Sequence, residues 1–366
     1  MTGQQAGARA LERIAEAGSV WIDPPTLGPA RPILELSGEA LRARLCTFTD
    51  SLGEEICLRP DMTTPIATMA AGGVIAMQRY HYAGTVYRLP PPGSSEPIEF
   101  GQIGFEWFGG GGPDEDADAL AVALGAARAG GVEAANLRFG DVALFRAVVD
   151  ALDFPASWSQ RLKLAFARRR GATELLREGP DRGPASALSA GLAMLSADEA
   201  GRAVEEILAI AGVQPVGGRS AAEIAERLRD AAGYRAPPAG PAASLIEYLE
   251  IEGPAGDCLA RLGAFAQKAG LDLSPAMEAF RIRLKRIEAL DPPFWNTAVF
   301  SAEAGRRFEY YDGFVFDLCR AASPDRPVVA GGRYDGLTAR MSGGKRSANA
   351  TGAMLRVDRL VDGGGG

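Results

Sequence analysis

Histidine and cysteine are scarce in this chain of 366 residues, which has one histidine, His81, and four cysteines. Zinc sites and histidine-based catalytic centres need clusters of these residues, so one histidine and scattered cysteines without a CxxC pair argue against both. We therefore expect no metal site and no cofactor. Free thiols in a reducing compartment, rather than a disulfide framework, are expected for Cys46, Cys57, Cys258 and Cys319.

An excess of basic charge and long apolar runs are also absent. The formal net charge is −7, whereas general nucleic-acid binders need a basic surface to displace phosphate counterions. No apolar run reaches the length of a membrane span, and residues 8–17 form a charged helical pattern rather than the apolar core of a signal peptide. With 47% hydrophobic and 23% charged residues, the composition indicates a cytoplasmic globular protein that binds neither nucleic acid nor membrane.

One short run, GQIGFEWFG at 101–109, combines strand-like alternation with polar residues. Alternation places Gln102 and Glu106 on one face and Phe105 and Trp107 on the other. A buried face with an amide and a carboxylate needs hydrogen-bond partners for both, and a bound small polar molecule is one source of them. The commoner interpretation of such a pattern is an edge strand with one side in water.

Strand-like segments at both ends of the chain bracket a helical middle. Alternation and turn residues predict a hairpin at 45–59, an aromatic strand at 78–88 and a second hairpin centred on Asp312-Gly313. Residues 157–290 are rich in alanine, leucine and arginine, and glycine and proline breaks divide them into helical segments.

This order predicts an α+β fold whose antiparallel sheet is built from distant parts of the sequence. We expect a discontinuous core at 1–150 and 291–362, a mostly helical insertion at 151–290, and a flexible tail at 363–366 that consists of glycine.

Four sequence blocks, read together, resemble the core of class II aminoacyl-tRNA synthetases in its histidyl form. The blocks are LRPDMTTP at 58–65, YRLPPPGSSEPIEFGQIGFEWFG at 87–109, GRRFEYYDGFVFDL at 305–318 and GGRYDGL…GAMLRVDRL at 331–360. The resemblance implies an antiparallel sheet flanked by helices, in a protein that is usually dimeric.

The resemblance also implies a pocket for a histidine-like ligand. A carboxylate and a hydroxyl suit the ligand's α-ammonium group, and arginines suit its carboxylate. Glu106 is expected to accept from an imidazole N–H, Gln102 to face the amino-acid head, and a tyrosine hydroxyl to reach the other ring nitrogen. For any single charged member, a surface ion pair is the alternative interpretation. The complete implied set is Asp61, Thr63, Arg88, Gln102, Glu106, Arg306, Tyr310 and Tyr311.

The sequence departs from the synthetases at positions that handle ATP. Pro90 stands where they have glutamate, the loop PPPGSSEP has no lysine or arginine, and Arg356 stands where they have glycine, although Arg359 is kept. A triphosphate is hard to bind without such cations, and Arg356 is expected to crowd the place of the adenine. The chain also stops directly after the last matching block, so we expect no anticodon-binding domain.

This combination is similar to the regulatory subunits of ATP phosphoribosyltransferase, a family of catalytically silent synthetase paralogues in histidine biosynthesis. The resemblance implies a non-catalytic subunit that the short-form catalytic subunit requires for activity and that transmits feedback inhibition by histidine. It also implies a hetero-octamer with that catalytic subunit and self-association as a dimer. Two alternatives stay open: a stand-alone enzyme that adenylates an amino acid, and an RNA-binding synthetase remnant, which the net acidity disfavours.

Overall fold

The structure is a computed structural model that describes residues 2–36, 42–91, 93–167, 171–178, 184–213, 220–232, 237–304 and 310–361. Its centre is a nine-stranded sheet in the order β1-β5-β6-β12-β11-β10-β7-β9-β8. In this order, the neighbouring strands of the run β5-β6-β12-β11-β10-β7 pair antiparallel. The pairs β1–β5 and β7–β9 are parallel. Their bounds are Val20–Trp21 (β1), Arg79–Tyr87 (β5), Glu99–Phe108 (β6), Asn136–Asp141 (β7), Glu252–Pro254 (β8), Val299–Ser301 (β9), Phe314–Cys319 (β10), Pro327–Arg333 (β11) and Ala350–Arg356 (β12).

Strand β6, which contains the GQIGFEWFG run, lies in the interior of this sheet between β5 and β12. The edge-strand interpretation is therefore wrong. Phe105 and Trp107 on one face and Gln102 and Glu106 on the other are all buried. The helices α1 (Gly3–Ala15) and α5 (Pro113–Ala129) pack along β5, β6 and β12. On the polar face, side chains from other segments hydrogen-bond to Glu106, so this face is covered by protein and not by water.

A second, three-stranded sheet has the order β2-β4-β3. The predicted hairpin at 45–59 is confirmed, because β3 (Thr47–Thr49) pairs antiparallel with β4 (Glu55–Leu58). β2 (Leu27–Pro29) pairs with the other side of β4. Helix α2 (Ala30–Leu36) packs on one face of this sheet, where a small apolar cluster contains Ala30, Ile33, Leu34, Leu45 and Cys57.

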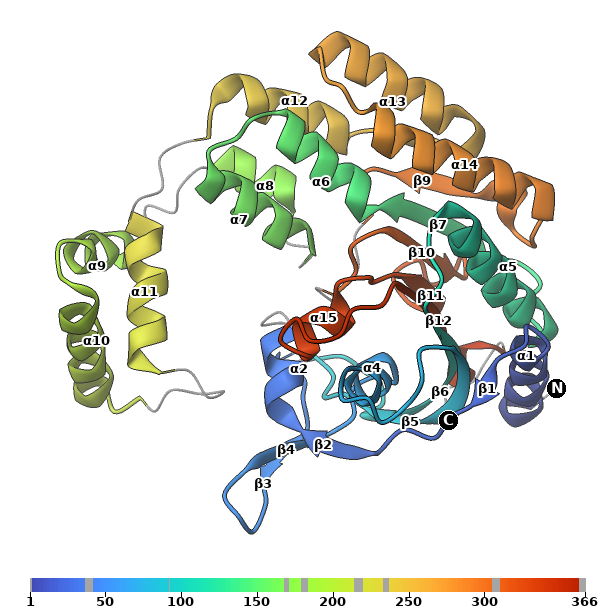
Figure 1. The fold of residues 1–366 in the computed structure, drawn as a ribbon, viewed down its shortest axis with the longest axis horizontal. Helices are drawn as coiled ribbons and strands as arrows, with labels where there is room; N and C mark the ends of the chain where they lie inside the picture. The colour runs from blue at the N-terminus through green and yellow to red at the C-terminus, as the bar shows by residue number, and fades with distance from the viewer. Residues whose placement is uncertain are drawn as a thin grey trace.

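The helical middle of the chain forms two packed groups (Figure 1). Helices α6–α8 and α12–α14 share the main apolar core, and α14 packs against α5. Helices α9–α11 have a separate small core of Leu192, Ala200, Val204 and Ala225. Their bounds are Val142–Ala151 (α6), Ala156–Ala167 (α7), Ala172–Glu178 (α8), Pro184–Ala193 (α9), Ala197–Ala211 (α10), Ala221–Ala232 (α11), Ala239–Leu249 (α12), Ala255–Ala269 (α13) and Ser274–Leu290 (α14).

Strand β8 comes from this helical region and still joins the main sheet beside β9. The division into a core at 1–150 and 291–362 and an insertion at 151–290 stays a prediction. The predicted glycine tail at 363–366 lies outside the described residues.

The hairpin predicted around Asp312-Gly313 is wrong. Strand β10 begins at Phe314 and pairs with β7 and β11, while Tyr310 and Tyr311 precede it in a loop. Asp312 instead accepts hydrogen bonds from the backbone N–H groups of Asp335 and Gly336, at 2.9 and 2.7 Å. Because this side chain ties two loops together, an Asp-Gly pair that is typical of a hairpin turn serves here as a loop clamp.

Candidate amino-acid pocket

Glu106 on β6 lies at the centre of a buried cluster of hydroxyl groups. Its Oε1 accepts from Thr63 Oγ1 at 2.6 Å and from the Tyr82 hydroxyl at 3.3 Å, and its Oε2 accepts from the Tyr334 hydroxyl. The side chain is 1% exposed. Burial raises the pKa of Glu106 to about 8, although the hydrogen bonds from Thr63 and Tyr334 oppose this shift.

A glycine makes room for this carboxylate. Gly352 on β12 lies opposite Glu106 in the sheet register. A Cβ added at Gly352 would collide with the carboxylate of Glu106 and would approach the carbonyl oxygen of Phe105 to 2.6 Å. The position therefore requires glycine because a side chain and a backbone approach it closely.

The start of helix α4 (Thr63–Ala71) brings two more predicted residues to the cluster. Asp61 Oδ1 accepts from the backbone N–H of Thr64 at 2.7 Å, which satisfies a donor in the first turn. This contact leaves Asp61 Oδ2 buried without a hydrogen bond from the described residues, and Gln102 Oε1 is in the same condition. Burial raises the pKa of Asp61, against the lowering effects of the Thr64 hydrogen bond and the Arg88 charge.

These two unsatisfied acceptors are informative because leaving a buried polar atom unpaired costs about 1–3 kcal/mol. Asp61 is 4% exposed and Gln102 is 1% exposed, and both line one small cavity. A carboxylate oxygen and an amide oxygen together suit a donor-rich cationic group such as a primary ammonium.

Arg88, just after β5, supplies positive charge beside the acids. Its Nε donates to the carbonyl oxygen of Pro60 at 2.5 Å, and its guanidinium carbon lies 5.3 Å from the centre of the Phe100 ring. Burial lowers the pKa of Arg88 to about 10, and the nearby Asp61 opposes that shift. An arginine held in this way remains charged near neutral pH and is placed to meet an anionic group.

The cavity itself is nearly closed, with a volume of about 20 Å³. That is room for about one water molecule, so an amino acid requires the walls to move apart. Tyr310 and Tyr311, whose rings lie 4.6 Å apart, form part of these walls. The full lining is Asp61, Thr63, Arg88, Gln102, Tyr310, Tyr311, Gly352, Ala353 and Met354.

The structure thus brings seven of the eight predicted pocket residues together. Six line the cavity, and Glu106 is bonded to Thr63 beside it. The eighth, Arg306, lies outside the described residues. The sequence interpretation missed Tyr82 and Tyr334, although both belong to segments that it had quoted as a strand and as the GGRYDGL block. Their orientation toward Glu106 depends on the strand register, which a single sequence does not reveal.

A second cavity of about 300 Å³ adjoins the first and shares Arg88 and Met354 with it. Glu96, in the loop between β5 and β6, reaches three arginines there. It lies 2.6 Å from Arg326, 2.6 Å from Arg359 and 3.4 Å from Arg356. Burial opposes the charged form of Glu96, but Arg359 and Arg356 outweigh it and lower the pKa of this carboxyl. The loop PPPGSSEP, which has no lysine or arginine, therefore contributes a carboxylate that pairs with three arginines.

Arg356 occupies the face of an aromatic ring in this second cavity. Its guanidinium carbon lies 3.5 Å from the centre of the Phe100 ring, and Asp358 holds the guanidinium through bonds of 2.8 and 2.6 Å. A planar ligand that stacked on this face of Phe100 would have to displace a paired cation.

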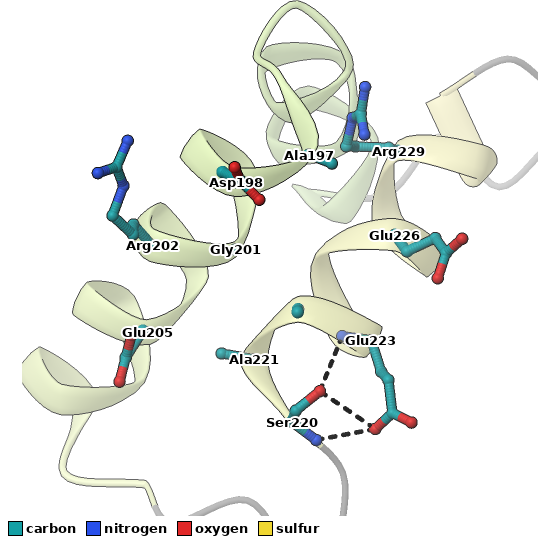
Figure 2. Close-up of a pocket in the computed structure, with 11 residues that line it drawn as sticks. Ala197, Asp198, Gly201, Arg202, Glu205, Ser220, Ala221, Glu223, Glu226 and Arg229 are labelled. Atoms are coloured by element: carbon teal, nitrogen blue, oxygen red, sulfur yellow. Dashed lines mark hydrogen bonds between the residues drawn. The ribbon is translucent and has the colours of Figure 1, made fainter.

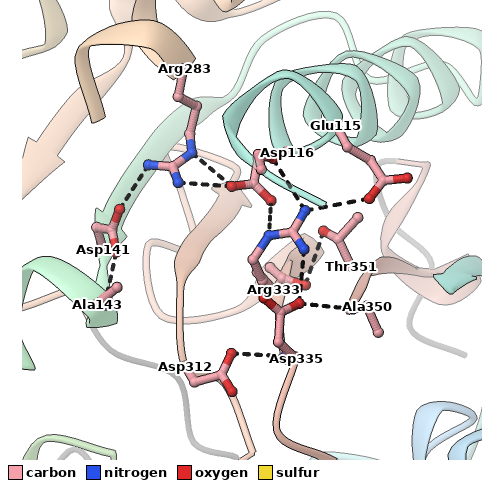
Figure 3. Close-up of polar contacts among 12 residues, drawn as sticks. Glu115, Asp116, Asp141, Ala143, Arg283, Asp312, Arg333, Asp335, Ala350 and Thr351 are labelled. Carbon is pink, nitrogen blue, oxygen red and sulfur yellow. Dashed lines mark hydrogen bonds and ion pairs between the residues drawn. The ribbon is translucent and has the colours of Figure 1, made fainter. Parts of the chain in front are cut away.

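A buried ion network surrounds Arg333, the last residue of β11 (Figure 3). Asp116 on α5 bonds Arg283 of α14 at 2.8 Å and Arg333 of β11 at 2.6 Å. Asp141, which caps α6, also bonds Arg283 at 2.7 Å, and Asp335 bonds Arg333 at 2.8 Å. The network fixes β11 directly before Tyr334 against two helices that lie far away in the sequence.

A further hollow of about 740 Å³ lies between α10 and α11 (Figure 2). Its lining is charged and open, and the Ser220 and Glu223 hydrogen bonds seen in it cap the start of α11. The sequence predicted no site here, and these contacts are those of an ordinary helix start. Among the described residues no group of histidine, cysteine, aspartate or glutamate could hold a metal ion, and no described helix could span a membrane.

Solved structures with a similar backbone show which fold this chain has. One is described as an ATP phosphoribosyltransferase regulatory subunit/histidyl-tRNA synthetase from Bacillus halodurans, with a TM-score of 0.68, 20% identity, and coverage of 100% of this chain and 79% of that one. Another is a histidyl-tRNA synthetase from Nostoc, with a TM-score of 0.61, 14% identity, and coverage of 98% and 70%. The predicted fold is confirmed: it is that of the class II synthetase core.

Sequence comparisons narrow this class to a family. The family model for histidyl-tRNA synthetase matches residues 4–238 and 241–360. An ATP phosphoribosyltransferase regulatory subunit from Allorhizobium ampelinum is 32% identical over 96% of this chain and 95% of its own length. One from Agrobacterium fabrum is 33% identical over 96% and 94%. The chain belongs to the histidyl-tRNA synthetase-like family of ATP phosphoribosyltransferase regulatory subunits.

Proposed function

We propose that this protein is a non-catalytic regulatory subunit of ATP phosphoribosyltransferase in histidine biosynthesis. It is required for the activity of a short-form catalytic subunit, and it transmits feedback inhibition by histidine to that subunit. The names of its relatives support the role. The observation that carries the effector assignment is the pair of buried, unsatisfied acceptors, Asp61 Oδ2 and Gln102 Oε1, beside Arg88.

Histidine is the ligand that this set of side chains fits best. Asp61, with Thr63, receives its ammonium group, and Arg88, with Arg306, receives its carboxylate. Glu106 accepts from a ring N–H, and Gln102 faces the amino-acid head. One hydroxyl of the Tyr310–Tyr311 pair donates to the other ring nitrogen. Such a mixed set of acids, bases and phenols complements a ligand that carries both charges and an imidazole.

Feedback inhibition requires histidine to favour one state of the protein, and the small volume of the cavity provides a reason for two states. Because about 20 Å³ does not hold histidine, binding selects a state in which the walls have moved apart. A ligand with different affinity for two states shifts their populations by that difference, which is the requirement for feedback inhibition.

The non-catalytic role is supported by the second cavity. Arg356 covers the face of Phe100, and Glu96 engages Arg326 and Arg359, so the cations that a nucleotide would need already have partners. The alternative enzyme, one that adenylates histidine, predicts histidine-dependent exchange of pyrophosphate into ATP above background. No cofactor, nucleic acid or membrane enters the proposed function.

The proposed assembly is a dimer of this chain within a cytoplasmic hetero-octamer that also contains the catalytic subunit. The experiment titrates histidine into this protein alone and then into its mixture with a short-form catalytic subunit. Asp61→Asn is expected to weaken histidine binding at least about tenfold, the loss of one charge-assisted hydrogen bond. Glu99→Gln, an exposed acid on the same sheet, is the control.

The inhibition curve of the mixture identifies the regulatory site. If inhibition weakens in parallel with binding, the pocket is the effector site. If binding weakens and inhibition does not change, regulatory histidine binds elsewhere. A protein that neither associates with the catalytic subunit nor alters its activity would refute the regulatory role.

A further inference from the structure

The carboxyl group of Glu106 is buried among neutral hydrogen-bond donors. The bonds that it accepts from described residues come from the hydroxyls of Thr63, Tyr82 and Tyr334. Asp61 adds a second negative charge nearby, and burial raises the pKa of Glu106 to about 8. Because a phenol hydroxyl accepts as well as donates, Tyr334 is also a partner for the hydrogen of a neutral carboxyl. The closed cavity therefore favours the form of Glu106 that holds a proton.

The other titratable groups around this carboxyl come from the segments next to α4 and β5 and from the loops before β10 and after β11. Among the described residues they are Asp61, Tyr82, Arg88, Tyr310, Tyr311 and Tyr334. Burial raises the pKa of Tyr82, Tyr310 and Tyr334 well above the ordinary value, so these phenols stay neutral donors. Asp61 is the other acid of the site, and burial raises its pKa as well.

Thr63 connects Glu106 to the place proposed for the ammonium group of the ligand. Its hydroxyl donates to Glu106 Oε1 at 2.6 Å, and the residue lines the cavity. Because a hydroxyl has one hydrogen and two acceptor positions, this oxygen can accept from an ammonium while it still donates to Glu106. An ammonium held by Thr63 and Asp61 then lies about 5 Å from the Glu106 carboxyl, close enough to favour its ionised form.

The imidazole of the ligand approaches the same carboxyl across Gly352. Gly352 lines the cavity, and a Cβ added there would collide with the carboxylate of Glu106. Glu106 thus lies directly behind a wall position that has no side chain. In the proposed binding mode a tyrosine hydroxyl donates to one ring nitrogen, so the ring is neutral and its other nitrogen carries the hydrogen. An ionised acceptor binds that N–H more strongly than a neutral one.

We infer that histidine binding expels a proton from Glu106. The ligand places an ammonium charge and a ring N–H against the carboxyl, and both favour its ionised form. The O–H bond of the carboxyl breaks, and the proton passes to the solvent. Histidine and this proton therefore compete for the protein, and the affinity for histidine rises with pH. This proton linkage rests on the proposed histidine site.

Calorimetry of the full chain counts the protons released when histidine binds, from the difference in heat between phosphate and Tris buffers. At pH 7.5 a carboxyl with a pKa of about 8 releases about 0.75 proton when it becomes ionised. The ring of free histidine is already about nine-tenths neutral at this pH and contributes about 0.1, and the ligand's ammonium can only take up a proton. A total release of no more than about 0.1 would mean that Glu106 keeps its proton or passes it to the ring, and would overturn the inference.

Glu106→Gln assigns the released proton to this residue. In the unmodified chain the affinity for histidine is expected to rise about eightfold between pH 7 and pH 8.5. Glutamine does not titrate, so Glu106→Gln is expected to show less than a twofold rise and a release of about 0.1 proton. The control Glu99→Gln, on the exposed end of the same strand, is expected to keep the unmodified values. A release that persists in Glu106→Gln would assign the proton to another acid, such as Asp61, and would contradict the inference.

Tyr334→Phe gives a second assignment that does not depend on histidine binding by Glu106→Gln. The phenol donates to Glu106 and favours its ionised form, so its loss should move the pH at which affinity levels off upward by about 0.5–1. An unchanged profile would exclude Glu106 as the source of the proton. Histidine binding without proton release refutes only the linkage, whereas a chain that binds no histidine at any of these pH values refutes the proposed histidine site as well.

Discussion

Replacing Glu106 with glutamine is expected to flatten the dependence of folding stability on pH between pH 6 and pH 8. Burial raises the pKa of this carboxyl from 4.5 to about 8 in the folded protein. Between those values the folded state holds more protons than the unfolded state, so the free energy of unfolding falls as pH rises. The stabilising contribution is complete below pH 4.5 and is lost by the time the pH passes 8.

The magnitude follows from the two pKa values. Proton linkage with 4.5 in the unfolded chain and about 8 in the folded chain gives a loss of about 2 kcal/mol between pH 6 and pH 8. Glutamine does not titrate, and it retains an oxygen that accepts from Thr63 or Tyr334. Glu106→Gln should therefore show a slope smaller by about this amount.

Urea unfolding at pH 6 and pH 8 measures the difference directly. Each protein serves as its own reference, so groups that titrate in both proteins cancel. Glu99→Gln, on the exposed end of the same strand, controls for the loss of one carboxylate from the surface. If Glu106→Gln and the unmodified protein lose the same stability between the two pH values, Glu106 is not a buried, proton-linked group and the reasoning fails.

Three other substitutions test the close approach at Gly352, the buried ion network and the pairing of Glu96 with arginines. Gly352→Ala should destabilise the fold by about 1–3 kcal/mol, seen as a lower urea midpoint, because its Cβ meets Glu106 and Phe105; an unchanged midpoint would contradict the close approach. Asp116→Asn should cost about 3 kcal/mol, since it removes the carboxylate between Arg283 and Arg333, whereas a surface ion pair would cost about 0–1 kcal/mol. Glu96→Gln should raise the affinity for inorganic pyrophosphate in calorimetry about tenfold, by releasing arginines from a competing carboxylate, and no gain would show that those arginines are unavailable for another reason.

The GQIGFEWFG strand shows how local pattern and tertiary position contribute different information. Alternation correctly predicted that Gln102 and Glu106 share a face. It did not predict that β6 lies between β5 and β12, because those partners come from segments on either side of it in sequence, one of them near the C-terminus. Whether a polar strand face meets water or protein depends on that pairing.

The Asp312-Gly313 pair shows that a local turn signal can predict a hairpin that the fold does not contain. Locally it is typical of a hairpin turn. In the fold, β10 finds its neighbours in β7 and β11, and Asp312 binds the backbone that follows β11. Long-range strand pairing overrides a short-range turn preference when it satisfies more backbone groups.

The sequence by itself determined the family and the chemical composition of the pocket. Its four blocks carry the acids, the arginine, the amide and the phenols, which are the groups that the proposed histidine ligand would pair with. Only the tertiary structure decided that Thr63, Tyr82 and Tyr334 converge on Glu106, that Asp61 and Gln102 keep unsatisfied oxygens, and that the cavity is closed. The physical reason is that burial and hydrogen-bond satisfaction are properties of the packed strands and helices, which bring together side chains far apart in the chain.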